Sequence, residues 1–140
     1  MLLPYVQGKV LMQLRDDRAG IAHPRAWGFF GGSICEGETP EEAVRREAIE
    51  ELRYEPETIT KLGAVRIPDL HHLSSHAYYC SLTVSVESLV LNEGMDLGLF
   101  TREELRLKRL HSAKMKQDFP IADTPYILAT VEQLFHRLGM

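Results

Sequence analysis

This chain contains little cysteine. It also has no apolar run long enough to cross a membrane. The two cysteines among 140 residues are Cys35 and Cys80, too few for the disulfide frameworks of small secreted domains. We expect two reduced, buried thiols, with a single disulfide between them as the alternative. The segment from Met1 to Pro4 is too short for a signal peptide and has no basic residue. These absences predict a soluble, cytoplasmic protein that does not bind a membrane.

Basic residues are also in short supply. The chain has 16 lysines and arginines against 20 acidic residues, and its formal net charge is −4. General nucleic-acid binding needs a basic surface, so the charge balance argues against it. A small phosphorylated ligand can still bind where a metal ion and a few arginines neutralise it locally. With 44% hydrophobic residues and no repeats, the chain can build one sizeable core, and we expect residues 1–140 to form a single domain.

The hydrophobic pattern predicts a mixture of strands and helices. Residues 76–86 alternate polar and apolar side chains, which is typical of a half-buried strand, and residues 122–138 repeat apolar side chains at helical spacing. Strands are predicted over residues 5–14, within residues 27–34, over about residues 59–67 and 76–86, and near residues 97–100. The predicted helices cover residues 40–53, a short segment after Thr101, and residues 122–138. Strands combined with a central and a terminal helix predict an α/β sandwich.

The helix over residues 40–53 has the clearest start. Thr39 is a good N-cap, Pro40 suits the first helical position, and Glu42 lies where a capping-box carboxylate reaches back to the cap. An apolar stripe on this helix should face the core. It consists of Val44, Ala48 and Leu52, with Ile49 beside it.

Three acids lie close together on the neighbouring face of the same helix. Glu47, Glu50 and Glu51 are three and four residues apart, and like charges at that spacing repel by a few tenths of a kcal/mol. Helix packing does not call for this arrangement, whereas a divalent cation does, because hard oxygen ligands suit Mg²⁺ or Mn²⁺. Upstream, Gly31 and Gly32 would let the backbone bend sharply and approach a ligand or metal closely.

The segment from Gly32 to Tyr54 resembles the Nudix box, G-x5-E-x7-R-E-U-x-E-E-x-G-U, in which U is an aliphatic residue. The positions that match at the correct spacing are Gly32, Glu38, Arg46, Glu47, Ala48, Glu50 and Glu51. Arg53 stands where the pattern has glycine, and Tyr54 stands where it has an aliphatic residue. The first departure concerns the end of the helix, where glycine usually supplies a left-handed cap.

The resemblance implies a Nudix-like α/β/α sandwich with a mixed β-sheet. It also implies a Mg²⁺-dependent hydrolase that cleaves a diphosphate linkage in a nucleoside diphosphate derivative, such as a nucleotide sugar, a dinucleotide or a nucleoside triphosphate. The implied metal ligands are the Gly32 carbonyl, Glu47, Glu50 and Glu51. The general base would be Glu47, Glu50 or Glu93, since the Asn92-Glu93-Gly94 loop resembles the second acidic site of the family. Family members often form homodimers, which makes a homodimer an expectation here.

Several further residues are candidates for supporting roles. Arg15 follows a strand like the first strand of the family, where an arginine often meets phosphate; a solvated strand end is the alternative. Arg25 is a second candidate phosphate ligand. Trp27 could stack on a base, although an aromatic residue before a glycine turn is more often part of the core. Glu38 and Arg46 are expected to form an ion pair that supports the site.

Two other interpretations stay open. A ligand-binding regulator with this fold would not need the acids of the box, and this chain retains them. An isomerase of isoprenyl diphosphates shares the resemblance, but its additional cysteine and histidine ligands have no evident counterpart here. His71, His72 and His76 do not have the spacing of a zinc site, and we expect them to be loop residues near the mouth of the cleft.

Overall fold

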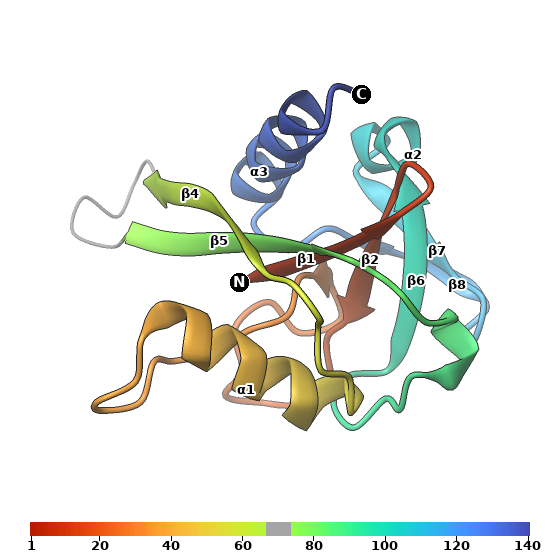
Figure 1. The fold of residues 1–140 in the computed structure, drawn as a ribbon. Helices are drawn as coiled ribbons and strands as arrows, with labels where there is room; N and C mark the ends of the chain where they lie inside the picture. The colour runs from red at the N-terminus through yellow and green to blue at the C-terminus, as the bar shows by residue number, and fades with distance from the viewer. Residues whose placement is uncertain (67–73) are drawn as a thin grey trace.

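A mixed, six-stranded β-sheet forms the middle of the molecule in the computed structural model, which describes residues 1–66 and 74–140 (Figure 1). The strands are β1 (Leu2–Val6), β2 (Lys9–Leu14), β3 (Trp27–Gly28), β4 (Thr60–Arg66), β5 (Ser74–Ser81), β6 (Asp96–Thr101), β7 (Arg109–Ser112) and β8 (Gln117–Pro120). The helices are α1 (Pro40–Leu52), α2 (Arg102–Arg106), α3 (Thr124–Arg137) and the 3₁₀-helix η1 (Val86–Ser88).

The sheet combines parallel and antiparallel pairs. Strands β3, β2, β1, β5 and β4 follow one another across it, and β6 pairs with β2. Strands β1 and β5 run parallel, while the other described pairs are antiparallel. Strands β7 and β8 form a separate two-stranded sheet.

Helices cover both faces of the sheet. Figure 1 shows α1 on one side of the strands and α3 on the other. Successive residues of β2 point to opposite faces, so Val10, Met12 and Leu14 pack in the core beneath α3, whereas Leu11 packs in the core beneath α1. The predicted α/β/α sandwich with a mixed sheet is confirmed.

Helix α1 begins where the sequence predicts. The Thr39 hydroxyl accepts from the Glu42 backbone N–H at 3.1 Å, and the Thr39 N–H donates to the Glu42 carboxylate at 3.2 Å. The predicted buried stripe is correct except for Ile49, which is 45% exposed. Glu51 is 5% exposed instead. The helix is therefore rotated so that one acid, and not Ile49, faces the sheet.

The two residues that depart from the Nudix box close the end of α1. Arg53 adopts a left-handed conformation with φ 51°, and its N–H donates to the Ile49 carbonyl at 2.9 Å. Tyr54 is buried, and its hydroxyl lies 3.3 Å from the Ser81 carbonyl and 3.1 Å from the Thr83 hydroxyl. The helix thus ends in the usual glycine geometry without a glycine, and a hydrogen-bonded tyrosine fills the aliphatic position.

Two of the predicted strand boundaries are wrong, and two further strands lie where they are predicted but differ in length. Residues 5–14 do not form one strand, because Gln7 and Gly8 both have positive φ and turn the chain between β1 and β2. The segment 27–34 contains the two-residue strand β3, followed by an isolated bridge between Phe30 and Leu2. Strand β5 ends at Ser81, five residues before the predicted boundary of residue 86. The predicted strand over residues 97–100 is longer, since β6 covers Asp96–Thr101.

The β7–β8 hairpin was not expected from the sequence. Each strand has four residues, too few for a clear alternation. Leu110 and Phe119 lie opposite each other in the hairpin and join the core beneath α3.

His71 and His72 lie outside the described residues, whereas His76 belongs to β5. Within the described parts of the chain, we find no helix of the length and hydropathy that a membrane span requires.

Replacement of Arg53 by glycine should stabilise the protein. A left-handed conformation costs an L-residue roughly 1–2 kcal/mol, and the greater freedom of glycine in the unfolded chain offsets part of that gain. We expect Arg53→Gly to raise the free energy of unfolding by about 0.5–1 kcal/mol in urea denaturation. Arg53→Ala removes the same side chain but retains the conformational cost, so it should not stabilise the protein. Equal stability of the two variants would contradict this account.

Candidate active site

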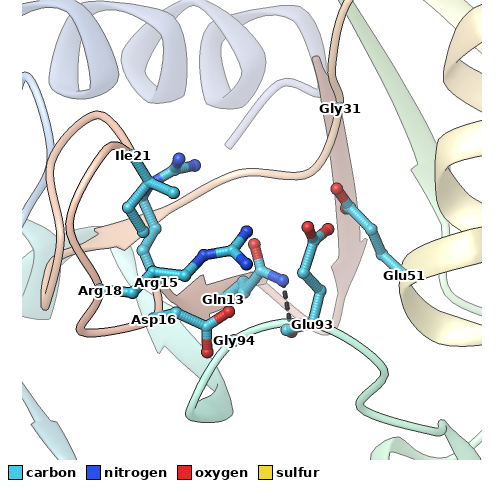
Figure 2. A pocket seen from close by; sticks show the side chains of 9 residues that line it. All are labelled: Gln13, Arg15, Asp16, Arg18, Ile21, Gly31, Glu51, Glu93 and Gly94. Carbon is cyan, nitrogen blue, oxygen red and sulfur yellow. Dashed lines mark hydrogen bonds between the residues drawn. The ribbon is translucent and has the colours of Figure 1, made fainter.

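One pocket opens between the C-terminal end of α1 and the loops at the end of β2. It is lined by Gln13, Arg15, Asp16, Arg18, Ile21, Gly31, Glu51, Glu93 and Gly94. In Figure 2 the glutamates Glu51 and Glu93 lie on one side of this pocket, and the arginines Arg15 and Arg18 lie on the other. Opposite charges from distant parts of the chain therefore face one another.

The segment of residues 90–92 binds the last turn of α1. The Val90 N–H donates to the Leu52 carbonyl at 3.1 Å, and the Asn92 N–H donates to the Glu51 carbonyl at 3.0 Å. The Asn92 side-chain amide donates to the Glu50 carbonyl at 3.0 Å. The last carbonyls of a helix have no partner within it, so this segment satisfies them and brings Glu93 next to Glu51.

Glu93 is also fixed from the side of the sheet. The buried Gln13 side chain donates from Nε2 to the Glu93 carbonyl at 2.5 Å. Gly94 packs on the same glutamine: a Cβ at position 94 would lie 2.7 Å from Gln13 Cγ, and the glycine has φ +97°. These contacts hold the Glu93 backbone in place and leave its carboxylate to line the pocket.

Glu51 is the buried acid of the site. Burial, followed by the negative charges of Glu93 and Glu47, raises the pKa of the Glu51 carboxyl to about 8. Its Oε2 atom is buried and has no hydrogen-bond partner among the residues that the structure describes. A buried oxygen without a partner is unusual in folded proteins, and at this position it could serve as a ligand for a cation.

Glu47 lies against the glycine turn. A Cβ at position 32 would be 2.5 Å from Glu47 Oε1 and 2.9 Å from its Cδ. A side chain at position 32 would displace the Glu47 carboxylate from its place against the backbone. Gly32 thus brings backbone and carboxylate together, as a metal site with a backbone carbonyl ligand requires.

Arg46 binds the remaining acids of the motif. Its guanidinium donates to the two Glu38 oxygens at 2.8 and 3.1 Å, to Glu47 at 3.0 Å and to Glu50 at 3.2 Å. It also donates to the Ser33 carbonyl at 3.0 Å. The hydrogen bonds from Arg46, together with one from the Cys35 N–H, lower the pKa of Glu38 to about 2. The expected contact between Glu38 and Arg46 is therefore present, and it ties the loop after Gly32 to α1.

Cys35 belongs to this loop and is exposed, contrary to the expectation of two buried thiols. Cys80 is buried, and both cysteines are free.

The helix acids fall into two groups in the structure. Glu50 is exposed and binds Arg46, whereas Glu51 lies in the pocket with Glu93. Within residues 1–66 and 74–140, no three acid, histidine or cysteine side chains are arranged to hold a metal ion. The donor types still fit Mg²⁺ or Mn²⁺, since hard oxygens, one of them without a partner, gather beside a glycine turn.

The predicted substrate ligands have different positions. Arg15 lines the pocket, and its Nε donates to the Ala22 carbonyl at 2.7 Å. Arg25 is absent from the pocket lining; it pairs with Asp17 at 3.3 Å and lies 5.5 Å from the centre of the Phe119 ring.

Trp27 is not a substrate ligand, and that prediction is wrong. Its side chain is 0% exposed, and its Nε1 donates to the Leu110 carbonyl at 3.0 Å. The ring packs edge-on against Phe100 with centroids 4.8 Å apart. A side chain without exposed surface cannot stack on a ligand, so the core alternative is correct.

Sequence reasoning missed part of the pocket. Gln13, Asp16, Arg18 and Ile21 line it, although no motif singles them out. Their signal in the sequence is weak. Gln13 is a polar residue within a predicted strand, and the other three belong to the charged loop that follows this strand.

A second pocket adjoins the first at Arg15, which lines both. Its other lining residues are Met1, Ala22, His23, Gly28, Phe29, Ala122, Asp123, Tyr126 and Ile127. The apolar members of this set offer a surface for a ring or an aliphatic group, and Asp123 adds one acceptor. The two pockets together could accommodate an anionic group linked to a less polar one.

The sequence matches the family model of the NUDIX domain over residues 4–119. This chain belongs to the Nudix family. The family prediction made from residues Gly32–Tyr54 is thus confirmed over most of the chain.

The chain is also similar to a hydrolase of known activity over part of its length. An oxidized purine nucleoside triphosphate hydrolase from Danio rerio is 33% identical over 66 residues, which are 47% of this chain and 40% of that protein. The match therefore spans less than half of that relative's length.

Solved Nudix structures share the fold over nearly the whole chain. The MutT NUDIX hydrolase of Burkholderia pseudomallei is 22% identical with a TM-score of 0.67, and the superposition covers 95% of this chain and 93% of that one. The NUDIX domain of Shewanella oneidensis NrtR, complexed with ADP ribose, is 21% identical with a TM-score of 0.68, covering 98% and 83%. At these identities, the likeness shows the fold.

The stability of the metal-free protein should depend on pH through Glu51. Its raised pKa means that the folded state holds a proton that the unfolded state releases near pH 4.5, so stability falls as the pH rises from about 4.5 to about 8. Glu51→Gln stays neutral throughout. In EDTA, the variant should lose about 3–4 kcal/mol less stability than the wild type between pH 5 and pH 8, as measured by urea denaturation.

Glu41→Gln is the matched control, since Glu41 is an exposed acid on the same helix. It should follow the wild-type profile. Parallel profiles for wild type and Glu51→Gln would show that burial of this acid carries no energetic cost.

Proposed function

We propose that this protein is a Mg²⁺- or Mn²⁺-dependent pyrophosphohydrolase that cleaves a diphosphate linkage in a nucleoside diphosphate derivative. The observation that carries the proposal is the buried Glu51 carboxylate, which has an oxygen without a partner and lies beside Glu93 in a pocket lined by arginines. Burying an acid next to the negative charge of a second, exposed acid is unfavourable unless a cation balances them. Because the burial of Glu51 is unfavourable in the metal-free protein, this site is suited to bind a divalent ion together with an anionic ligand.

The residues that would hold the metal are Glu47, Glu50 and Glu51 with the Gly32 carbonyl. Glu50 would have to turn from Arg46 to take part, whereas Glu47 and Glu51 already lie beside the glycine turn. When bound, a divalent ion offsets charge on the phosphates and makes a water molecule more acidic.

The side chains around that ion would bind the substrate and accept a proton. The Arg15 guanidinium would bind a phosphate oxygen, since it lines the pocket opposite the acids. The base candidates are Glu47, Glu50 and Glu93. Glu93 is favoured by its place in the pocket and by the two contacts that fix its backbone. It would accept the proton of the attacking water.

The second pocket would hold the non-phosphate part of the substrate. Phe29 and Ile127 could pack against a planar base, and the Asp123 carboxylate could accept from its N–H groups. The Danio rerio relative is named for a purine nucleoside triphosphate, and the Shewanella oneidensis domain binds ADP ribose. We therefore propose a nucleotide as the substrate. A cytoplasmic location and a homodimer remain predictions.

A non-catalytic regulator is the second candidate. It would need the ligand pocket but not the acids, and the costly burial of Glu51 favours a catalytic role. Removing the acids therefore separates the two candidates.

Hydrolysis should require the acids and a divalent ion. We expect the wild type with Mg²⁺ to cleave at least one member of a panel of nucleoside triphosphates, dinucleotides and nucleotide sugars, measured as phosphate released after phosphatase treatment. Glu47→Gln and Glu51→Gln should each lower kcat/KM about a hundredfold or more, and EDTA should abolish turnover. Glu41→Gln should retain full rate. Turnover that survives EDTA, or a fully active Glu51→Gln variant, contradicts the proposal.

Metal binding can be measured without turnover. A ligand that binds the folded state raises the melting temperature, so Mn²⁺ should stabilise the wild type at pH 8 and should stabilise Glu51→Gln much less. The melting temperature of each protein is measured with and without 1 mM Mn²⁺. For a Kd of about 10 μM this concentration is roughly a hundredfold excess, and it would stabilise the folded state by about 2.7 kcal/mol. An equal shift in both proteins would place the ion elsewhere.

A further inference from the structure

Arg18 is an unpaired cation in the pocket wall. It lines the pocket with Arg15 and Asp16, and none of the hydrogen bonds or ion pairs found among the described residues involves it. Arg25, from the same loop, is paired with Asp17 and lies over Phe119. The loop thus contains one arginine that its own residues neutralise and another that they do not.

Hydrogen bonds between its two ends hold the loop of residues 15–26 closed, and none of them uses the Arg18 side chain. The Arg15 N–H donates to the Ala26 carbonyl at 2.9 Å, and the Arg25 N–H donates to the Asp16 carbonyl at 3.3 Å. The Arg15 side chain donates to the Ala22 carbonyl at 2.7 Å across the loop. One of the Arg15 donors is therefore already in use, whereas all five donors of Arg18 are available to a ligand.

The charge of this wall depends on Arg18. Asp16 lines the same wall and has no ion-pair partner among the described residues. Without Arg18, the charges of Arg15 and Asp16 would cancel, and the wall would not attract an anion. With Arg18, the wall has one net positive charge, facing the acids across the pocket.

Binding of a diphosphate alone does not require the positive charge of Arg18. If the proposed function holds, the diphosphate that is cleaved would be bound by the Arg15 guanidinium and by a divalent ion held at the acids. A further guanidinium in the same pocket then matches a further anionic group. Phosphate is the group that a planar guanidinium binds well through paired hydrogen bonds.

We propose that Arg18 binds a third phosphate and selects substrates with a triphosphate chain over those with a diphosphate alone. This inference rests on the proposed function, because it places the first two phosphates at the acids and Arg15. It makes nucleoside triphosphates the favoured substrate class within that function.

Binding of two inorganic probes tests the inference without turnover. Isothermal titration calorimetry would measure the Kd of tripolyphosphate and of pyrophosphate in Ca²⁺, which takes similar oxygen ligands, for the wild type, Arg18→Ala, Arg18→Lys and Arg25→Ala. Arg18→Ala should weaken tripolyphosphate roughly fivefold to tenfold and pyrophosphate by less than about twofold. Arg18→Lys should recover part of the loss, since lysine retains the charge but not the paired donors.

Arg25→Ala is the matched control, because it removes a cation of the same loop that does not line the pocket. It should leave both constants unchanged. Equal losses for the two probes in Arg18→Ala, no loss for either, or an equal loss in Arg25→Ala would each overturn the inference. A wild type that binds tripolyphosphate no more tightly than pyrophosphate would overturn it as well.

Failure of the proposed function looks different. In that case, the wild type would hydrolyse no substrate of the panel with Mg²⁺, whatever the two binding constants show. If hydrolysis occurs and the Arg18 variants bind as the wild type does, the inference alone fails.

Discussion

The contact between the last turn of α1 and residues 90–92 is the interaction on which the site depends. A helix end leaves carbonyls without partners, and here the Val90 and Asn92 amides and the Asn92 side chain bind three of them. This places Glu93, some forty residues away in sequence, beside Glu51. The same hydrogen bonds that complete the helix thus assemble the two acids of the pocket.

Electrostatics divides the acids of the motif into two functional sets. Arg46 forms ion pairs with Glu38, Glu47 and Glu50, and these pairs hold the loop after Gly32 against α1. Among the described residues, Glu51 and Glu93 form no such ion pair, and the Met1 ammonium is the cation that interacts with Glu51. Burial and the neighbouring acids Glu93 and Glu47 raise the pKa of Glu51. A folded protein can tolerate one such unfavourable position when the surrounding structure is well packed, and these positions are common at functional sites. A metal ion bound between these acids and an anionic ligand would balance the negative charge of Glu51 and Glu93.

Local signals in the sequence predicted the parts of the fold that depend on neighbours along the chain. Helix α1 begins at Pro40 as expected, because the cap formed by Thr39 and Glu42 needs only residues within one turn. The turn at Gln7 and Gly8 was missed, since glutamine at a positive φ has little local signal and the flanking residues read as one continuous strand. The short strands β7 and β8 were missed because pairing with each other, and not a long alternation, stabilises them.

The sequence by itself determined the family, the α/β/α architecture and the acids of the box, because spacing along one helix decides which side chains can act together. Tertiary structure alone decided how these acids are used. Burial selected Glu51, since helix packing turned that face toward the sheet and left Ile49 exposed. Folding also placed Trp27 in the core and Arg18 in the pocket, because both outcomes depend on contacts between segments that are distant in sequence.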